Sequence, residues 1–128
     1  MKSLIILLSL FSLQAIAVEG TGGSATTEKP SYRYPSDLSD EESQQMIMSR
    51  VKYDDCLKKE TNKYIDKYED FRKVADVAME DCKSTLVEID GDLEKMNLDP
   101  NFIRFFLHNT TQKSTQELLH ELMIRMSE

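Results

Sequence analysis

The chain contains two cysteines, Cys56 and Cys82, and each lies in a segment whose apolar residues recur at helical spacing. Residues joined across an antiparallel pair of helices lie about equally far from the turn that connects them. The midpoint between the cysteines is residue 69, inside the polar segment of residues 66–70 (DKYED). The cysteine positions and the apolar pattern therefore independently predict a helical hairpin that turns at 66–70 and is joined by a disulfide.

The N-terminus predicts the oxidising compartment that such a disulfide requires. Lys2 supplies a positive charge, residues 3–13 form an apolar run without charge, and residues 14–17 (QAIA) place small residues where a signal peptidase cleaves. We expect residues 1–17 to be a signal peptide that is removed before Val18, and the protein to be periplasmic or secreted. An uncleaved membrane anchor is the alternative, but about eleven apolar residues are too few to span a bilayer.

The spacing of Cys56 and Cys82 separates a structural disulfide from other uses of cysteine. The 25 residues between them differ from the C-x-x-C of redox catalysts, and the chain lacks the second ligand pair of a zinc site. Free thiols and a bond between chains are the alternatives. We predict a disulfide within the chain, because this is the simplest use of an even pair of cysteines in an exported protein.

Composition divides the rest of the chain into a leader and a helical domain. Residues 18–38 hold three of the four glycines and two of the three prolines. Little in this segment can be buried, so we expect it to be a flexible leader. Docking of Tyr32, Arg33 and Tyr34 on another surface is the alternative. Residues 39–127 carry the helical pattern and are expected to form one helical domain.

The first two helical segments are expected to form the hairpin. The first begins at Ser39, which forms a capping box with Glu42. Its apolar residues recur at rough helical spacing and are Ile47, Val51, Leu57, Tyr64, Ile65 and Tyr68. The second segment runs from Phe71 to Met96 with steps of three and four between apolar residues, and Gly91 is its one weak helix former.

A third helical segment follows a restart of the chain. Asp99 is placed to cap a helix whose first residue is Pro100. A second capping box at residues 114–117 (STQE) predicts a break near residue 112. No segment alternates with period two, so no strand is expected. The sequence predicts an all-α bundle of three helices, or of four if the last one breaks, in which the first two form a disulfide-linked antiparallel hairpin.

The charge of the chain argues against two classes of partner. The net charge is −7, and removal of residues 1–17 takes away one lysine and no acid, so it becomes −8. Nucleic acids and anionic lipid headgroups would be repelled by such a protein. No later stretch approaches the ~20 apolar residues of a transmembrane helix. We therefore expect no nucleic acid partner and no membrane insertion after signal cleavage.

No arrangement of residues indicates catalysis. His108 and His120 are the side chains that titrate near neutrality, and on one helix their separation would be about 18 Å. The sequence lacks a G-x-S-x-G elbow and a glycine-rich phosphate loop. The carboxylates alternate with lysines, as they do on solvated helix faces. We expect no enzymatic activity and no cofactor.

Copper binding is a remote alternative function, because His120 and several methionines are of the kind that bind Cu(I). His120, Met123 and Met126 recur at intervals of three, and Met46 and Met48 add two thioethers. Imidazole and thioether groups suit Cu(I). Steps of three residues drift around a helix, however, so the three groups do not converge. Methionine also commonly fills protein cores, and we predict no metal site.

Residues 102–107 (FIRFFL) form the most unusual segment, because five of the six side chains are apolar. Either this segment is the buried centre of the bundle, or part of it is exposed as a dimer interface or a partner site. Phe106 shares a helix face with Phe102, whereas Phe105 points about 100° away from Phe106. Phe102, Phe105 and Phe106 are therefore the candidate interaction residues.

These features together predict a non-enzymatic exported protein that acts by contact with another protein. The partner is unknown, and a homodimer is one form that the contact could take. The alternative is a carrier that binds a small hydrophobic molecule between the helices near residues 102–107. A carrier requires an enclosed apolar pocket, whereas an interaction protein requires a filled core and an exposed apolar patch.

Overall fold

The computed structural model describes residues 29–128. They form four α-helices, α1 (Asp40–Tyr64), α2 (Phe71–Asp81), α3 (Lys83–Lys95) and α4 (Pro100–Arg125), preceded by a short 3-10 turn, η1 (Pro35–Asp37). No strand occurs within this range, where an isolated β-bridge joins Arg33 to Leu98. The prediction of a small all-α bundle is confirmed. The predicted signal peptide, residues 1–17, lies outside the described residues.

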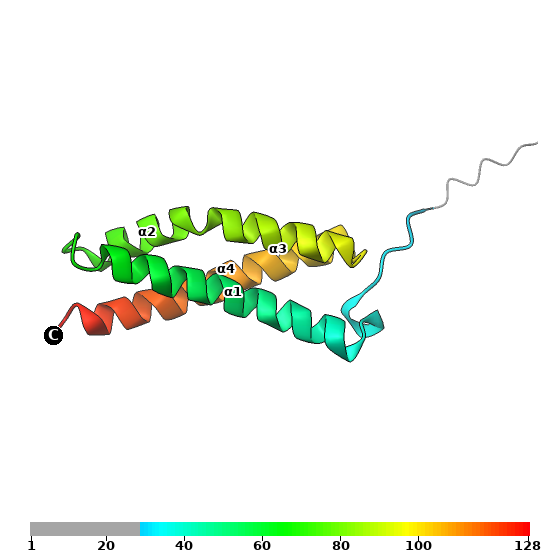
Figure 1. The fold of residues 1–128 in the computed structure, drawn as a ribbon, viewed down its shortest axis with the longest axis horizontal. Helices are drawn as coiled ribbons and strands as arrows, with labels where there is room; N and C mark the ends of the chain where they lie inside the picture. Colours follow the sequence, from blue (N-terminus) through cyan, green and yellow to red (C-terminus); the bar gives the residue numbers. More distant parts are fainter. Residues whose placement is uncertain (1–28) are drawn as a thin grey trace, which may run out of the picture.

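The four helices make three rods (Figure 1). Helices α2 and α3 lie end to end and run antiparallel to α1, and α4 then returns in the same direction as α1. Each rod contacts the other two, and contacts between α1 and α2 and between α2 and α4 are the most extensive. The rod formed by α2 and α3 therefore holds α1 and α4 together.

The hairpin between α1 and α2 has the turn and the bond that the sequence predicts. Helix α1 ends at Tyr64 and α2 begins at Phe71, where Asp70 accepts a hydrogen bond from the backbone N–H of Arg72 at 2.9 Å. Cys56 and Cys82 are bonded, with Cα atoms 6.0 Å apart. The prediction of a disulfide-linked antiparallel hairpin is confirmed.

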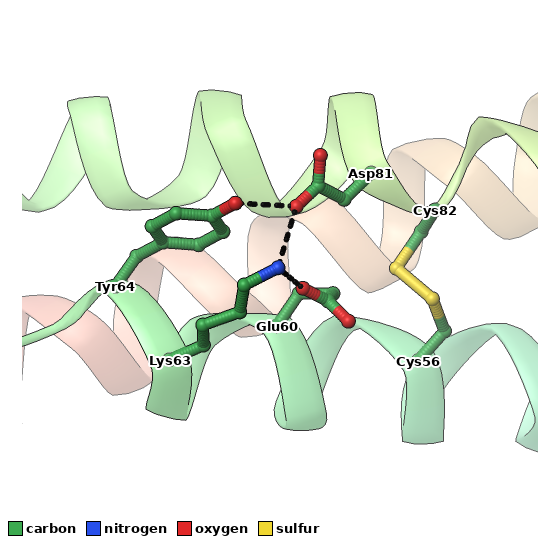
Figure 2. Close-up of a disulfide and its surroundings, with 6 residues drawn as sticks. All are labelled: Cys56, Glu60, Lys63, Tyr64, Asp81 and Cys82. Atoms are coloured by element: carbon green, nitrogen blue, oxygen red, sulfur yellow. Dashed lines mark hydrogen bonds and ion pairs between the residues drawn. A yellow bond between two sulfur atoms is a disulfide. The ribbon is translucent and has the colours of Figure 1, made fainter.

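A group of polar contacts lies beside the disulfide on the same side of the hairpin (Figure 2). The hydroxyl of Tyr64 donates to the Asp81 carboxylate at 2.6 Å, and the Lys63 ammonium lies 3.0 Å from Glu60 and 3.4 Å from Asp81. The hydrogen bond from Tyr64 lowers the pKa of Asp81. These contacts connect the last turns of α1 to the end of α2, so the disulfide and this group together fix the alignment of the hairpin.

The segment expected to be one helix from Phe71 to Met96 is divided at Cys82. The backbone of Cys82 (φ −92°, ψ 3°) leaves the helical region, so it ends α2 and begins α3. Its N–H still donates to Ala78, and its carbonyl still accepts from Thr85 and Leu86. One residue outside the helical region barely alters the spacing of apolar side chains, which is why the periodicity does not reveal the break.

The break predicted near residue 112 does not occur. Helix α4 is continuous from Asp99, whose carboxylate caps Asn101 and Phe102 as expected, to Arg125. Ser114, the residue expected to cap a new helix, is instead buried, and its hydroxyl donates to the carboxylate of Asp54 on α1. A tertiary contact uses the hydroxyl that would otherwise have capped a helix. The count of four helices therefore arises from the break at Cys82.

The buried face of α1 also differs from the predicted one. Ile47 and Val51, expected in the core, are 57% and 38% exposed, whereas Tyr53 and Thr61 are almost completely buried. Hydroxyl-bearing residues interrupt the true buried stripe, so a search for apolar spacing selects the wrong face in the first half of α1. The buried apolar residues are Tyr53, Leu57, Val74, Ala75, Ala78, Cys82, Ile89, Leu93, Leu98, Ile103, Leu118 and Leu122.

Candidate interaction surface

The end of the segment expected to be a flexible leader is held against the bundle. We call residues 29–38 the N-terminal strap. Within it, the N–H of Arg33 donates to the carbonyl of Asn97 at 2.9 Å, and the carbonyl of Arg33 accepts from the N–H of Asp99 at 3.0 Å. The side chain of Asn97 donates to the carbonyl of Ser31 at 3.0 Å. The last part of the segment predicted to be a flexible leader thus has backbone partners in the α3–α4 loop.

Arg33 also connects the strap to the start of α1. Its guanidinium donates two hydrogen bonds to the carboxylate of Glu42, both of 2.7 Å, and a third of 2.8 Å to the carbonyl of Asp37. The hydrogen bond from Arg33, together with one from the backbone N–H of Ser39, lowers the pKa of Glu42 to about 2. Glu42 thereby serves both the capping box of α1 and the strap.

The structure divides the three candidate phenylalanines between the core and the surface. Phe102 and Phe106 are partly buried and pack on the core, with ring centroids 6.3 Å apart. Ile103, on the neighbouring face, is buried. Phe105 points away from this packing and is 64% exposed. The segment is therefore neither wholly buried nor wholly exposed, and Phe105 is its accessible residue.

Other exposed apolar side chains are spread over three helices. Val87 on α3 is 71% exposed. Helix α1 presents three that the sequence did not single out for this role, Ile47, Met48 and Val51, and α4 presents Met123 and Ile124 near its end. Single exposed apolar residues are normal on soluble proteins. Tyr32 and Tyr34 of the strap are also exposed, at 39% and 56%. Among the exposed apolar residues of the four helices, Phe105 is the aromatic one, and it adjoins a packed aromatic pair.

A groove lies between α3 and α4 beneath the strap. This α3–α4 groove has a volume of about 420 Å³. Its lining includes Tyr32 of the strap, Asp90 and Glu94 of α3, and Ile103 and Arg104 of α4. Tyr32 also borders a neighbouring hollow formed by the strap and the start of α4. The sequence did not reveal this groove, because its walls come from segments far apart in the chain.

The residues considered for copper differ in their exposure. Met126 packs on the core, whereas His120 and Met123 are exposed. Met46 is partly buried and Met48 is exposed. Among residues 29–128, no group of three or more His, Cys, Asp or Glu side chains is arranged to hold a metal ion.

Comparisons with known proteins supply no relative on which a function could be based. No protein family, curated protein or solved structure matches the chain. Within the described residues, no helix combines the length and the apolar character needed to cross a bilayer. The Cys56–Cys82 disulfide indicates an oxidising compartment.

Proposed function

We propose that this is an exported, non-enzymatic helical protein that acts by binding another protein through the surface of α4 around Phe105. The observation that carries the proposal is the 64% exposure of Phe105 beside the packed Phe102 and Phe106. Aromatic side chains are among the residues that contribute most to protein interfaces. Burying the exposed part of this ring against a partner would contribute about 1–2 kcal/mol.

The form of the hollows favours this proposal over a carrier of small hydrophobic molecules. Five hollows in the described part of the chain, including the one between α3 and α4, are partly open to solvent rather than enclosed. The carrier alternative places its pocket between the helices near residues 102–107, where Ile103 and Arg104 line the partly open α3–α4 groove. A carrier requires an enclosed apolar pocket.

Export is the second part of the proposal. It rests on the signal-peptide pattern of residues 1–17 and on the disulfide. Together they support a periplasmic or extracellular location, where a structural disulfide persists. The partner is accordingly expected among exported proteins, and a second copy of this chain is one candidate.

The test compares two truncations of exposed apolar side chains. Phe105→Ala and Ile124→Ala each remove an exposed apolar side chain from α4, at positions about 28 Å apart and on different faces of the helix. Immobilised wild-type protein is expected to retain a specific protein from the exported fraction, or to self-associate in sedimentation experiments. Phe105→Ala should weaken that association, while Ile124→Ala should leave it unchanged. Equal behaviour of the two variants would remove Phe105 from the interaction surface.

A further inference from the structure

The α3–α4 groove has the dimensions and lining of a binding site for a single side chain. Its volume, about 420 Å³, falls at the lower end of the ~300–1,000 Å³ typical of ligand sites. The apolar side chains at its base are Leu98 and Ile103, both buried in the core. Tyr32 stands at the rim and is 39% exposed. An extended side chain with an apolar stem would meet the exposed edges of Leu98 and Ile103, which are 1% and 3% exposed, and the ring of Tyr32.

Two carboxylates on the α3 wall of the groove form no ion pair within residues 29–128, and Arg104 lines the opposite wall. Helix α3 carries four carboxylates, and two of them form ion pairs: Glu88 with Lys52 and Asp92 with Lys95. The other two, Asp90 and Glu94, line the groove and form no ion pair with any residue between 29 and 128. They are one helical turn apart, so both carboxylates lie on the same side of α3. The free negative charge of this helix is thus concentrated at the groove.

The opposite wall and the rim add two further features. Arg104 on α4 donates a hydrogen bond of 2.7 Å to the side chain of Asn101, its neighbour on the same helix. Tyr32 offers an aromatic face, which attracts cations. The backbone hydrogen bonds of the strap on either side of Tyr32, at Ser31 and Arg33, fix its position. The rim is therefore already in place before a ligand arrives.

We infer that the α3–α4 groove receives a lysine or arginine side chain from a basic segment of the partner protein. The methylene stem of such a side chain lies along Leu98 and Ile103, and its cationic head reaches Asp90 and Glu94. The negative net charge of the chain, −7 overall, favours the approach of a basic partner. The inference rests on the proposed function, since it names the charge of the partner and a second point of contact beside Phe105.

The test uses a probe with a single cationic side chain. The disulfide-bonded protein, labelled with ¹⁵N and lacking the signal peptide, is titrated with acetyl-Ala-Arg-Ala-amide while amide chemical shifts are recorded. Saturable shifts are expected at Asn97, Leu98 and Ile103. The same peptide with citrulline in place of arginine has nearly the same shape without the charge, and should bind at least several-fold more weakly. Shifts spread over all the acidic helices, or equal binding of the citrulline peptide, would overturn the inference.

Variants separate the groove from the general acidity of the protein. Asp90→Asn combined with Glu94→Gln should weaken binding about 3- to 10-fold, as expected for two partly exposed ion pairs. Asp55→Asn combined with Asp76→Asn removes the same charge from exposed sites outside the groove and should have little effect. Equal weakening by both double variants would contradict a site in the groove.

Two single variants complete the experiment. Arg104→Ala removes the competing cation from the opposite wall and should leave binding of the arginine peptide equal or tighter. Weaker binding to this variant would mean that the groove prefers an anion, contrary to the inference. Phe105→Ala should leave peptide binding unchanged. Failure of the peptide to bind would therefore reject the groove without deciding the role of Phe105, which the association experiment tests separately.

Discussion

Two adjacent phenylalanines of α4 have opposite environments, and helical geometry accounts for the difference. Phe106 follows Phe102 by four residues, so both face the core, whereas Phe105 is rotated by about 100° and faces solvent. The angular part of this arrangement could be predicted from the sequence. Which of the two faces meets the rest of the bundle could not, because that depends on how α4 packs on α2.

Paired truncations should separate the two roles. Phe106→Ala should lower the free energy of unfolding by about 2–3 kcal/mol, somewhat below the usual range for a fully buried phenylalanine because Phe106 is only partly buried. Phe105→Ala should change it by less than about 0.5 kcal/mol, as is usual for surface residues. Thermal or chemical denaturation of the two variants provides the measurement. Equal destabilisation would place both rings in the core.

The contact between Arg33 and Glu42 should make stability depend on pH. The pKa of Glu42 falls from an ordinary value of 4.5 to about 2 in the folded protein. A lowered folded-state pKa stabilises the protein above pH 4.5, and this contribution is lost as the pH falls from 4.5 towards 2. The difference in melting temperature between wild type and Glu42→Gln should therefore be larger at pH 6 than at pH 2.5. A difference that does not vary with pH would mean that the pair does not form in solution.

At the scale of the elements, the disulfide and the break between α2 and α3 occur at the same residue. Cys82 is completely buried and joins the rod to α1 at the point where its backbone departs from the helix. Reduction should lower the free energy of unfolding by about 3.5 kcal/mol, the value that the chain-entropy model assigns to a loop of this size. Denaturation with and without a reductant measures the change. Unchanged stability of fully alkylated protein would show that the bond contributes nothing.

Gly91 provides a test of α3 as a continuous helix after the break. A Cβ atom added at this position would meet no atom within 4 Å beyond its chain neighbours and the backbone of its own helix. Gly91→Ala should therefore raise the free energy of unfolding by about 0.5–1 kcal/mol, because alanine favours the helix and no contact opposes it. A shift in melting temperature of several degrees is expected for a domain of this size. Destabilisation would indicate that residue 91 is not helical or is less accessible than described.

Local signals in the sequence predicted the elements better than they predicted the contacts between elements. The capping residues Ser39 and Asp99 and the turn after Tyr64 all follow from short-range hydrogen bonding and polarity. Docking of residues 32–34 was only an alternative in the sequence, and its site could not be predicted, because Arg33 finds its partners at Glu42 and Asn97, on elements that only the fold brings together. The α3–α4 groove was missed for the same reason.

At the scale of the whole molecule, the protein is a narrow helical bundle around one apolar core, with two candidate binding features near the start of α4. One is the exposed ring of Phe105, and the other is the α3–α4 groove with its two free carboxylates. The Cys56–Cys82 disulfide adds to the stability that so small a core provides. The strap fixes the rim of the groove to the rest of the bundle through Arg33.

The most direct test of the central claim is photo-crosslinking in the native host. Benzoylphenylalanine placed at position 105 keeps an aromatic ring where Phe105 is exposed. The control is the same residue in place of Ile124, which is 50% exposed, lies about 28 Å further along α4 and is on a different face. Illumination of the disulfide-bonded protein should give a discrete covalent adduct from position 105, with a partner protein or with a second copy of this chain. Position 124 should give none. The absence of an adduct at position 105, or an equal adduct from position 124, would contradict the account.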